Sequence, residues 1–177
     1  MLPGLPRLRA HRYYRAMHRV LNHYLGDRSF RVVHISIQSN HLHLVVEASD
    51  RRALTRCMQS LAIRAAREIN RAYRNRVGKV FAHRYHATQI TTPRQARNTL
   101  AYVLNNWRKH REDRRTHDAQ QLDPYASGLT FRGWSGTPRF RVPDNPLPVS
   151  AARTQLLRFD WELFGLIGCF EVPGAPW

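Results

Sequence analysis

The chain has 177 residues, enough for one domain with a sizeable core. Its 29 Lys and Arg residues outnumber 12 Asp and Glu residues, which gives a formal net charge of +17 at pH 7. This excess favours a polyanionic partner, nucleic acid first and an acidic membrane surface second, with a solvated basic surface as the remaining alternative. No run of about 18 apolar residues and no secretion signal occur, and Cys57 and Cys169 lack metal-type spacing. We therefore expect a reduced, cytoplasmic protein that neither spans a membrane nor is secreted.

A helix followed by a β-hairpin is predicted at the start of the chain. Apolar residues recur at helical spacing over residues 9–25, and Gly26 is well placed to end that helix. Residues 30–37 alternate around β-branched side chains, as in a strand, and residues 38–40 form a turn into the next strand. His34 lies on the first strand, where we interpret it as a packing histidine rather than a metal ligand.

The second strand carries two histidines. Alternate residues of a strand share a face, so His41 and His43 should project to one side together with Val45 and Glu47. Leu42 and the apolar residues that follow it at every second position should be buried under helices. Two imidazoles on one strand form half of a metal site, and a divalent ion would need further ligands from elsewhere. A solvated pair is the alternative interpretation of these two residues taken alone.

The clearest predicted helix covers residues 53–76, where an apolar stripe includes Leu61 and Ile69. Several arginines lie largely off that stripe. They can form a track for nucleic-acid phosphates or a solvated helix face, and the sequence leaves both interpretations open. These arginines are Arg56, Arg64, Arg67, Arg71 and Arg74.

An extended segment, residues 80–90, follows a turn that contains Gly78. His83 and His86 have opposite strand parity there, so they cannot both face one metal ion if the segment is a regular strand. We keep His86 as a reserve metal ligand or phosphate contact.

The next helix has a well-marked beginning. Thr92 can cap it, Pro93 suits its first turn, and Gln95 completes a capping box. Tyr102 and Asn106 lie one turn apart on the polar side of this helix. A tyrosine hydroxyl and a carboxamide can supply a nucleophile and a metal ligand, although a tyrosine on a helix is more often a packing residue.

The remainder of the chain has mostly loop composition. Residues 112–121 predict a linker or a fraying helix end, residues 136–148 are rich in proline and should run extended, and residues 151–166 predict a last short helix. We therefore divide the chain into a catalytic-type domain over 1–115 and a loop-rich extension over 116–177.

Two motifs together resemble a known family. His41-Leu42-His43 matches the His-hydrophobic-His pair of the HUH superfamily, and Tyr102-Val103-Leu104-Asn105-Asn106 matches its Tyr-(Ile/Val)-x-x-Asn helix motif. The chain thus resembles the single-tyrosine transposases of this superfamily, most closely the REP-associated tyrosine transposases. The resemblance extends over roughly residues 5–135, and two motifs in the right order are more specific than either alone.

The resemblance implies an α+β fold, a ferredoxin-like antiparallel sheet with helices packed on one face. It also implies cleavage and rejoining of single-stranded, hairpin-forming DNA without a nucleotide cofactor. Tyr102 would attack a phosphodiester to give a 5′-phosphotyrosine and a free 3′ hydroxyl. A tyrosine hydroxyl has a pKa near 10 and is a poor nucleophile at neutral pH, so Mg²⁺ or Mn²⁺ near the phosphate is required.

In this interpretation His41, His43 and Asn106 hold the metal ion, and a homodimer is one of the assemblies allowed. Aromatic residues such as Tyr85, Trp107 or Trp134 could stack on unpaired bases. The residues expected to contact nucleic acid are Arg56, Arg64, Arg67, Arg71, Arg74, Arg84, His86 and Lys109.

The sequence departs from the family pattern in two places. Family members normally have a central strand ahead of the first helix, whereas this chain enters the helix almost at once, so we expect either a translation start upstream of Met1 or the loss of that strand. The usual Asn-Pro after the tyrosine is Asn106-Trp107 here, so the helix should continue past Asn106.

Two other functions compete with strand transfer. A non-catalytic binder of structured single-stranded DNA or RNA would tolerate Tyr102→Phe, whereas the transposase would lose all cleavage. A metal-dependent hydrolase with a water nucleophile would stay active without Tyr102 and would form no covalent adduct.

Overall fold

The computed structural model describes residues 1–2, 4–113, 118–139 and 145–174. Its longer elements are three helices and two strands, and short elements follow in the C-terminal part of the chain. In chain order they are α1 (His11–Asn22), β1 (Phe30–Ile37), β2 (Leu42–Ala48), α2 (Arg51–Ala72), α3 (Pro93–Lys109), η1 (Ser127–Thr130), β3 (Trp134–Ser135), α4 (Gln155–Arg158), η2 (Asp160–Phe164) and β4 (Ile167–Gly168).

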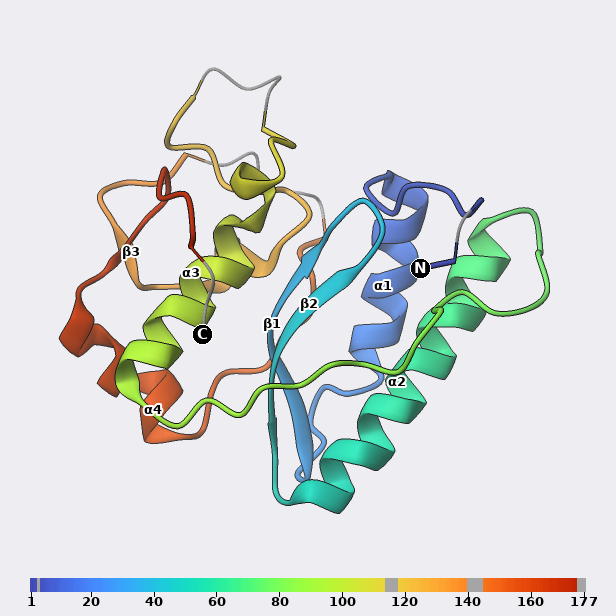
Figure 1. Cartoon of the computed structure of the whole chain (residues 1–177), viewed down its shortest axis with the longest axis horizontal. Helices are drawn as coiled ribbons and strands as arrows, with labels where there is room; N and C mark the ends of the chain where they lie inside the picture. The colour runs from blue at the N-terminus through green and yellow to red at the C-terminus, as the bar shows by residue number, and fades with distance from the viewer. Residues whose placement is uncertain (3, 114–117, 140–144, 175–177) are drawn as a thin grey trace.

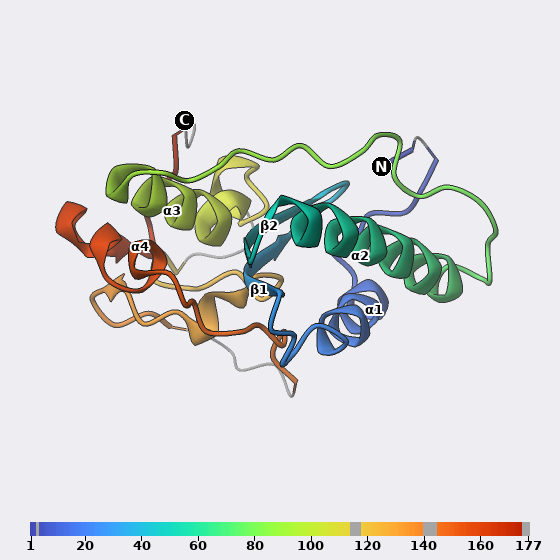
Figure 2. The same cartoon turned by 90° about the horizontal axis from the view of Figure 1, so that it is seen from below.

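The β1–β2 ribbon lies between two helical layers (Figure 1, Figure 2). Helices α1 and α2 pack together on one side, in a core whose buried side chains include Tyr13 and Phe30. Helix α3 and the C-terminal extension lie on the other side, in a second core that includes Leu100, Trp161 and Ile167. The mixed α/β class with helices packed against an antiparallel sheet, predicted from the sequence, is confirmed, although the helices lie on both faces of the ribbon and not on one.

The register of the ribbon fixes which face each histidine occupies. Ile37 pairs with Leu42 and Phe30 with Ala48, with an irregularity between Val32 and His34. Leu42 and the apolar residues alternating with it join the α1–α2 core. Val45, on the opposite face, contacts the cluster that includes Val103 of α3. The predicted alternation along β2 is therefore confirmed, and His43 faces the α3 side.

Both long helices begin at side-chain caps. The Asp50 carboxylate accepts a hydrogen bond from the Ala53 N–H at 2.8 Å. At α3 the Thr92 hydroxyl accepts from the Gln95 N–H at 3.2 Å, as predicted. The Gln95 Oε1 accepts a hydrogen bond from the Thr91 N–H at 2.9 Å. A capping box would instead use the N–H of the cap residue itself, Thr92. The helix runs past Asn106 to Lys109, as the absence of proline at 107 predicts.

Residues 80–90 connect the two helical layers. Val80 is buried in the α1–α2 core and Ile90 packs against the α3 clusters, while residues 83–89 between them are exposed. In Figure 1 this segment crosses in front of the ribbon on its way from α2 to α3. It is extended, as predicted, but it forms no strand pairing with the described part of the chain. Ahead of α1, residues 1–2 and 4–10 likewise form no strand, and the Leu2 N–H donates to the Val80 carbonyl at 3.0 Å.

The C-terminal extension covers the outer edge of β1. The Ile37 N–H donates to the Tyr125 carbonyl at 2.9 Å, and the Ser150 N–H donates to the Val32 carbonyl at 2.8 Å. The helix predicted within residues 151–166 is divided into α4 and η2. Residues 114–117 of the predicted linker, and 140–144 of the predicted proline-rich stretch, lie outside the described residues.

None of the described helices combines the length and the apolar character needed to cross a membrane.

Candidate active site

The histidine strand and the tyrosine helix meet between β2 and α3. The rings of His43 and Tyr102 are in edge-to-face contact, with centroids 5.0 Å apart and planes at 82°. Beside them, the Nε2 atoms of His41 and His43 are only 2.8 Å apart. Tyr102 is partly buried rather than exposed. The tertiary structure therefore brings together the two motifs that lie about sixty residues apart in sequence.

His110 is a further residue of this cluster, and the sequence analysis missed it. Its ring centroid lies 5.7 Å from that of His41, again edge to face. Tyr102, Asn106 and His110 are spaced by four residues and so share one stripe of the α3 surface. That spacing was the available signal, but His110 comes just after the predicted family motif.

Asn106 is bracketed by these two contacts. Tyr102, one turn before it, touches His43, and His110, one turn after it, touches His41. Asn106 is completely buried, and among the described residues neither its Nδ2 nor its Oδ1 has a hydrogen-bond partner. Leaving a buried carboxamide unpaired costs stability, so this side chain is better suited to a ligand than to the fold.

Burial keeps the imidazole pair neutral. Desolvation lowers the pKa of His43 to about 4, and the nearby His41, His110 and Lys109 act in the same direction. Burial also lowers the pKa of His41, with His110 contributing. At neutral pH both rings therefore keep a lone pair that can bind a metal ion.

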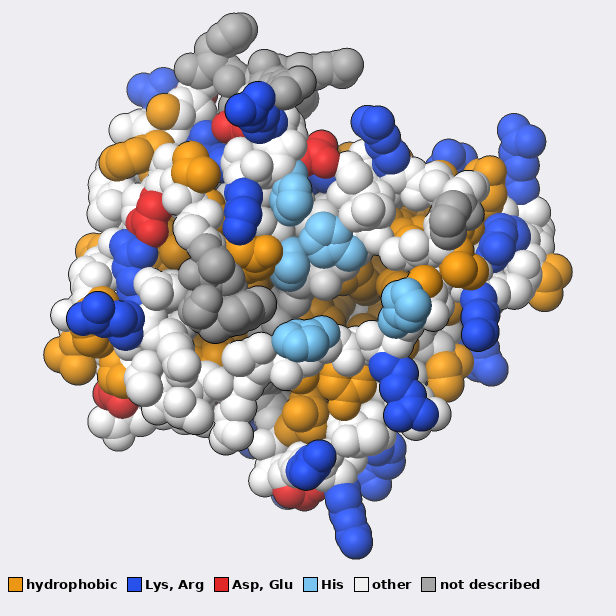
Figure 3. Space-filling view, viewed as in Figure 1, with side chains coloured by type: hydrophobic (Ala, Val, Ile, Leu, Met, Phe, Trp, Pro, Cys, Tyr) orange, Lys and Arg blue, Asp and Glu red, His pale blue; other side chains and the backbone are white. Residues whose placement is uncertain are grey.

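The surface around this cluster is hollowed and basic. Figure 3 shows histidine side chains gathered around a hollow at the centre of the face seen in Figure 1, with hydrophobic side chains at its floor. The Lys109 ammonium lies 4.9 Å from the centroid of the Tyr102 ring. A neutral imidazole pair, a tyrosine and a cation in contact with one another form a site that suits a phosphate substrate.

A family model described as "Transposase IS200 like" matches residues 7–106, more than half of the chain. The chain belongs to the IS200-like transposase family. The matched region contains Tyr102 and Asn106 as well as both strand histidines, and it ends before His110. Searches among curated proteins and among solved structures gave no significant match.

The extension of this transposase holds the other side of α3. The Asn105 Nδ2 donates to the Gly168 carbonyl at 2.8 Å. The Arg108 guanidinium donates to the Cys169 carbonyl at 2.7 Å and pairs with the Asp113 carboxylate at 3.1 Å. These contacts fix the rotation of α3 about its axis, and so the direction in which the Tyr102 stripe points.

The predicted nucleic-acid residues of the transposase come from three segments of the chain. Most of the α2 arginines are exposed, and Arg74 lies beyond the end of α2 with a positive φ of 51°. Arg84 and His86 are exposed on the segment between α2 and α3, and Lys109 lies at the cluster.

The stacking role proposed for two aromatic residues is wrong. Trp107 and Trp134 are buried, at 3% and 8% exposure, and Trp134 packs in the core between α3 and the extension. Tyr85, at 39% exposure, is accessible to a base.

The metal ion implied by the resemblance would need donor atoms from these residues. Among the described residues, no group of three or more His, Cys, Asp or Glu side chains is arranged to hold an ion. The donor set that fits is two neutral imidazoles with converging Nε2 atoms, together with the unpaired carboxamide of Asn106. Such a mixed nitrogen and oxygen set suits Mn²⁺, and less strongly Mg²⁺.

Proposed function

We propose that this transposase cleaves and rejoins single-stranded, hairpin-forming DNA through a covalent bond to Tyr102. The observation that carries the proposal is the contact between the rings of His43 and Tyr102, with His41 Nε2 beside them. It brings the candidate nucleophile next to the candidate metal ligands within one chain.

In the proposed reaction the Tyr102 hydroxyl oxygen attacks the phosphorus of a DNA phosphodiester. A phosphorus–oxygen bond to Tyr102 forms, the bond to the 3′ oxygen breaks, and the departing 3′ oxygen takes up a proton. The phosphotyrosine preserves the bond energy, so attack by a 3′ hydroxyl reverses the step and rejoins DNA without a nucleotide cofactor.

His41, His43 and Asn106 would hold a Mg²⁺ or Mn²⁺ ion. When bound, the ion would polarise the scissile phosphate and stabilise charge on its oxygens. Lys109, next to the Tyr102 ring, would attract the same phosphate, and Arg84 and His86 would contact the strand as it leaves the site.

The test uses labelled single-stranded oligonucleotides from the DNA that flanks the gene, incubated with the protein and Mn²⁺ and separated on a denaturing gel. We expect label to migrate with the protein in a chelator-sensitive reaction. Tyr102→Phe should abolish this adduct, because the phenylalanine ring keeps the packing but has no nucleophile.

Tyr85→Phe is the matched control, since Tyr85 is an accessible tyrosine outside the ring cluster and its variant should form the adduct normally. Adduct that persists in Tyr102→Phe would refute the assignment of the nucleophile. Tight binding without adduct for any flanking strand would favour the non-catalytic binder, and cleavage without adduct would favour the hydrolase.

A further inference from the structure

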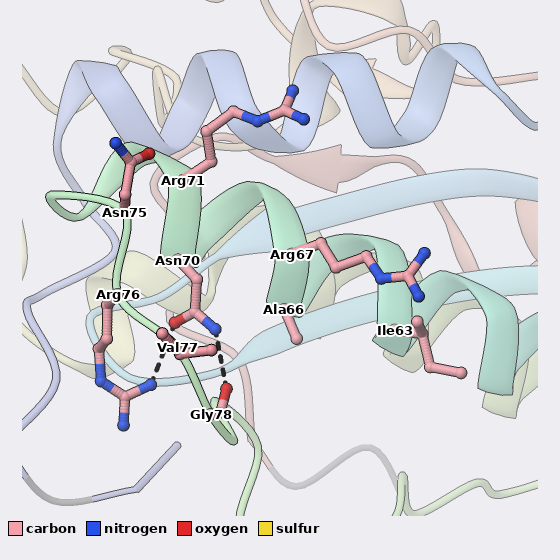
Figure 4. Close-up of a pocket in the computed structure, with 9 residues that line it drawn as sticks. All are labelled: Ile63, Ala66, Arg67, Asn70, Arg71, Asn75, Arg76, Val77 and Gly78. Carbon is pink, nitrogen blue, oxygen red and sulfur yellow. Dashed lines mark hydrogen bonds between the residues drawn. The ribbon is translucent and has the colours of Figure 1, made fainter.

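The outer surface of α2 carries a shallow groove that the proposed active site does not use. Two adjoining hollows, of about 480 Å³ and about 250 Å³, share Ile63 and Arg67. The larger one ends against the loop that leaves α2 at residues 75–78 (Figure 4). Because α2 packs on the ribbon face opposite to His43, this groove lies away from the Tyr102 cluster.

The floor of the groove is apolar although it faces solvent. Ile63 is 46% exposed and Val77 is 89% exposed. Figure 4 shows both on the same side of α2 as Ala66, with the Arg67 guanidinium at one end of the row and the Arg76 guanidinium at the other. Exposed apolar side chains framed by cations suit a ligand that has both a flat apolar part and negative charge.

The loop wall of the groove is held in place by hydrogen bonds. The Asn70 Nδ2 donates to the Gly78 carbonyl at 2.8 Å. The Arg76 Nη1 donates to the Asn70 Oδ1 at 3.1 Å and to the Lys79 carbonyl at 2.9 Å. Gly78 has a φ of 105°, which other residues adopt only with strain. The wall is therefore formed before any ligand arrives.

The groove carries a positive charge on Arg67 that can pair with a ligand. No carboxylate in the described part of the chain pairs with Arg67. Glu68 is already engaged by Arg19 and Arg71, at 2.7 Å and 3.0 Å. Arg71 accordingly points toward α1 in Figure 4, away from the apolar row.

We propose that this groove binds an unpaired segment of single-stranded DNA. A base lies against Ile63 and Val77, and the phosphates on either side of it contact Arg67 and Arg76. A duplex keeps its bases stacked inside, so the apolar floor contacts a base only where the strand is unpaired. The inference rests on the proposed single-stranded substrate and adds a contact that holds the strand at a distance from Tyr102.

The test measures fluorescence anisotropy of a labelled oligo-dT strand, and of a duplex of equal length, with chelator present so that no cleavage occurs. The double variant Ile63→Ser with Val77→Ser should weaken single-strand binding by about fivefold or more. Its duplex affinity and the salt dependence of binding should not change, because no charge is removed. Arg67→Gln should weaken binding and lower the slope of log K against log salt by about 0.7 for the single strand.

Matched controls lie on the C-terminal extension. Leu163→Ser removes an apolar side chain that is 77% exposed, and Arg132→Gln removes an exposed arginine, and both should bind the single strand as the unaltered protein does. Unchanged single-strand affinity in the double variant, or an equal loss for duplex, would overturn the inference. If the unaltered protein forms no adduct while the Ile63→Ser, Val77→Ser variant still loses single-strand binding selectively, the result counts against the proposed function alone.

Discussion

Helix α3 has two polar sides that differ in how their hydrogen bonds are satisfied. On the side that faces the extension, Asn105 and Arg108 are buried and bonded to backbone carbonyls. On the side that faces the ribbon, Asn106 is equally buried, yet both of its amide atoms are without partners in the described structure. Adjacent asparagines thus differ in their environment: Asn105 has a hydrogen-bond partner that stabilises the fold, and Asn106 carries an unpaired buried amide, which costs stability.

The largest loss of stability is expected when the hydrogen bonds on the extension side of α3 are removed. Arg108→Met should lower the free energy of unfolding by roughly 3–5 kcal/mol, because it leaves Asp113 unpaired and deprives three buried or partly buried carbonyls of a donor. Urea unfolding followed by circular dichroism measures this change. Arg132→Gln, an exposed arginine on the extension, should change stability by less than about 0.5 kcal/mol. Equal effects would show that Arg108 does not anchor α3.

A second expected loss of stability depends on pH. His34 is buried against the extension, where its Nδ1 lies 3.1 Å from the Ser127 hydroxyl, and burial lowers its pKa to about 4. The unfolded chain takes up this proton near pH 6.5 and the folded chain only near pH 4, so stability falls as pH drops through this window. The loss amounts to about 3 kcal/mol at 1.4 kcal/mol per unit.

Urea unfolding between pH 7 and pH 4 tests this expectation. His34→Gln should flatten the pH dependence in part, since His43 has a pKa lowered in the same direction and remains. An unaltered slope in His34→Gln would rule out His34 as a source of the acid sensitivity.

The pair of asparagines gives the most direct test of the comparison. Asn105→Leu should destabilise the protein by about 1–3 kcal/mol, because the Gly168 carbonyl loses its donor. Asn106→Leu should leave the free energy of unfolding within about 1 kcal/mol or raise it, because it removes an unpaired buried amide. The same Asn106→Leu variant should lose Mn²⁺-dependent adduct formation. A large destabilisation by Asn106→Leu would mean that this side of α3 is structural as well.

The smallest effect on stability is expected at His110. This residue is exposed, so His110→Ala should change the free energy of unfolding by less than about 0.5 kcal/mol. Its ring contact with His41 should nevertheless matter for the site, and the rate of adduct formation should fall by about tenfold. His18→Ala, a histidine on α1 away from the cluster, is the control for removal of an imidazole. An adduct rate unchanged by His110→Ala would remove His110 from the site.

The sequence by itself determined the local features of this protein. The alternation of β2 predicted that His41 and His43 share a face, and the Thr92 cap predicted where α3 begins, because both depend on residues only two or three positions apart. The two motifs also indicated a transposase, and the family match agrees. The division at residue 115 and the metal ion stay predictions.

Only the tertiary structure decided which polar residues of α3 have hydrogen-bond partners. The motif singled out Asn106 and not Asn105, but only the fold shows that Asn105 bonds to the Gly168 carbonyl, 63 residues away, while Asn106 has no partner among the described residues. Trp107 and Trp134, which the resemblance led us to expect as base-stacking residues, are both buried in the fold. Contacts between segments this distant depend on how the layers pack, and no periodicity within a helix or strand encodes them.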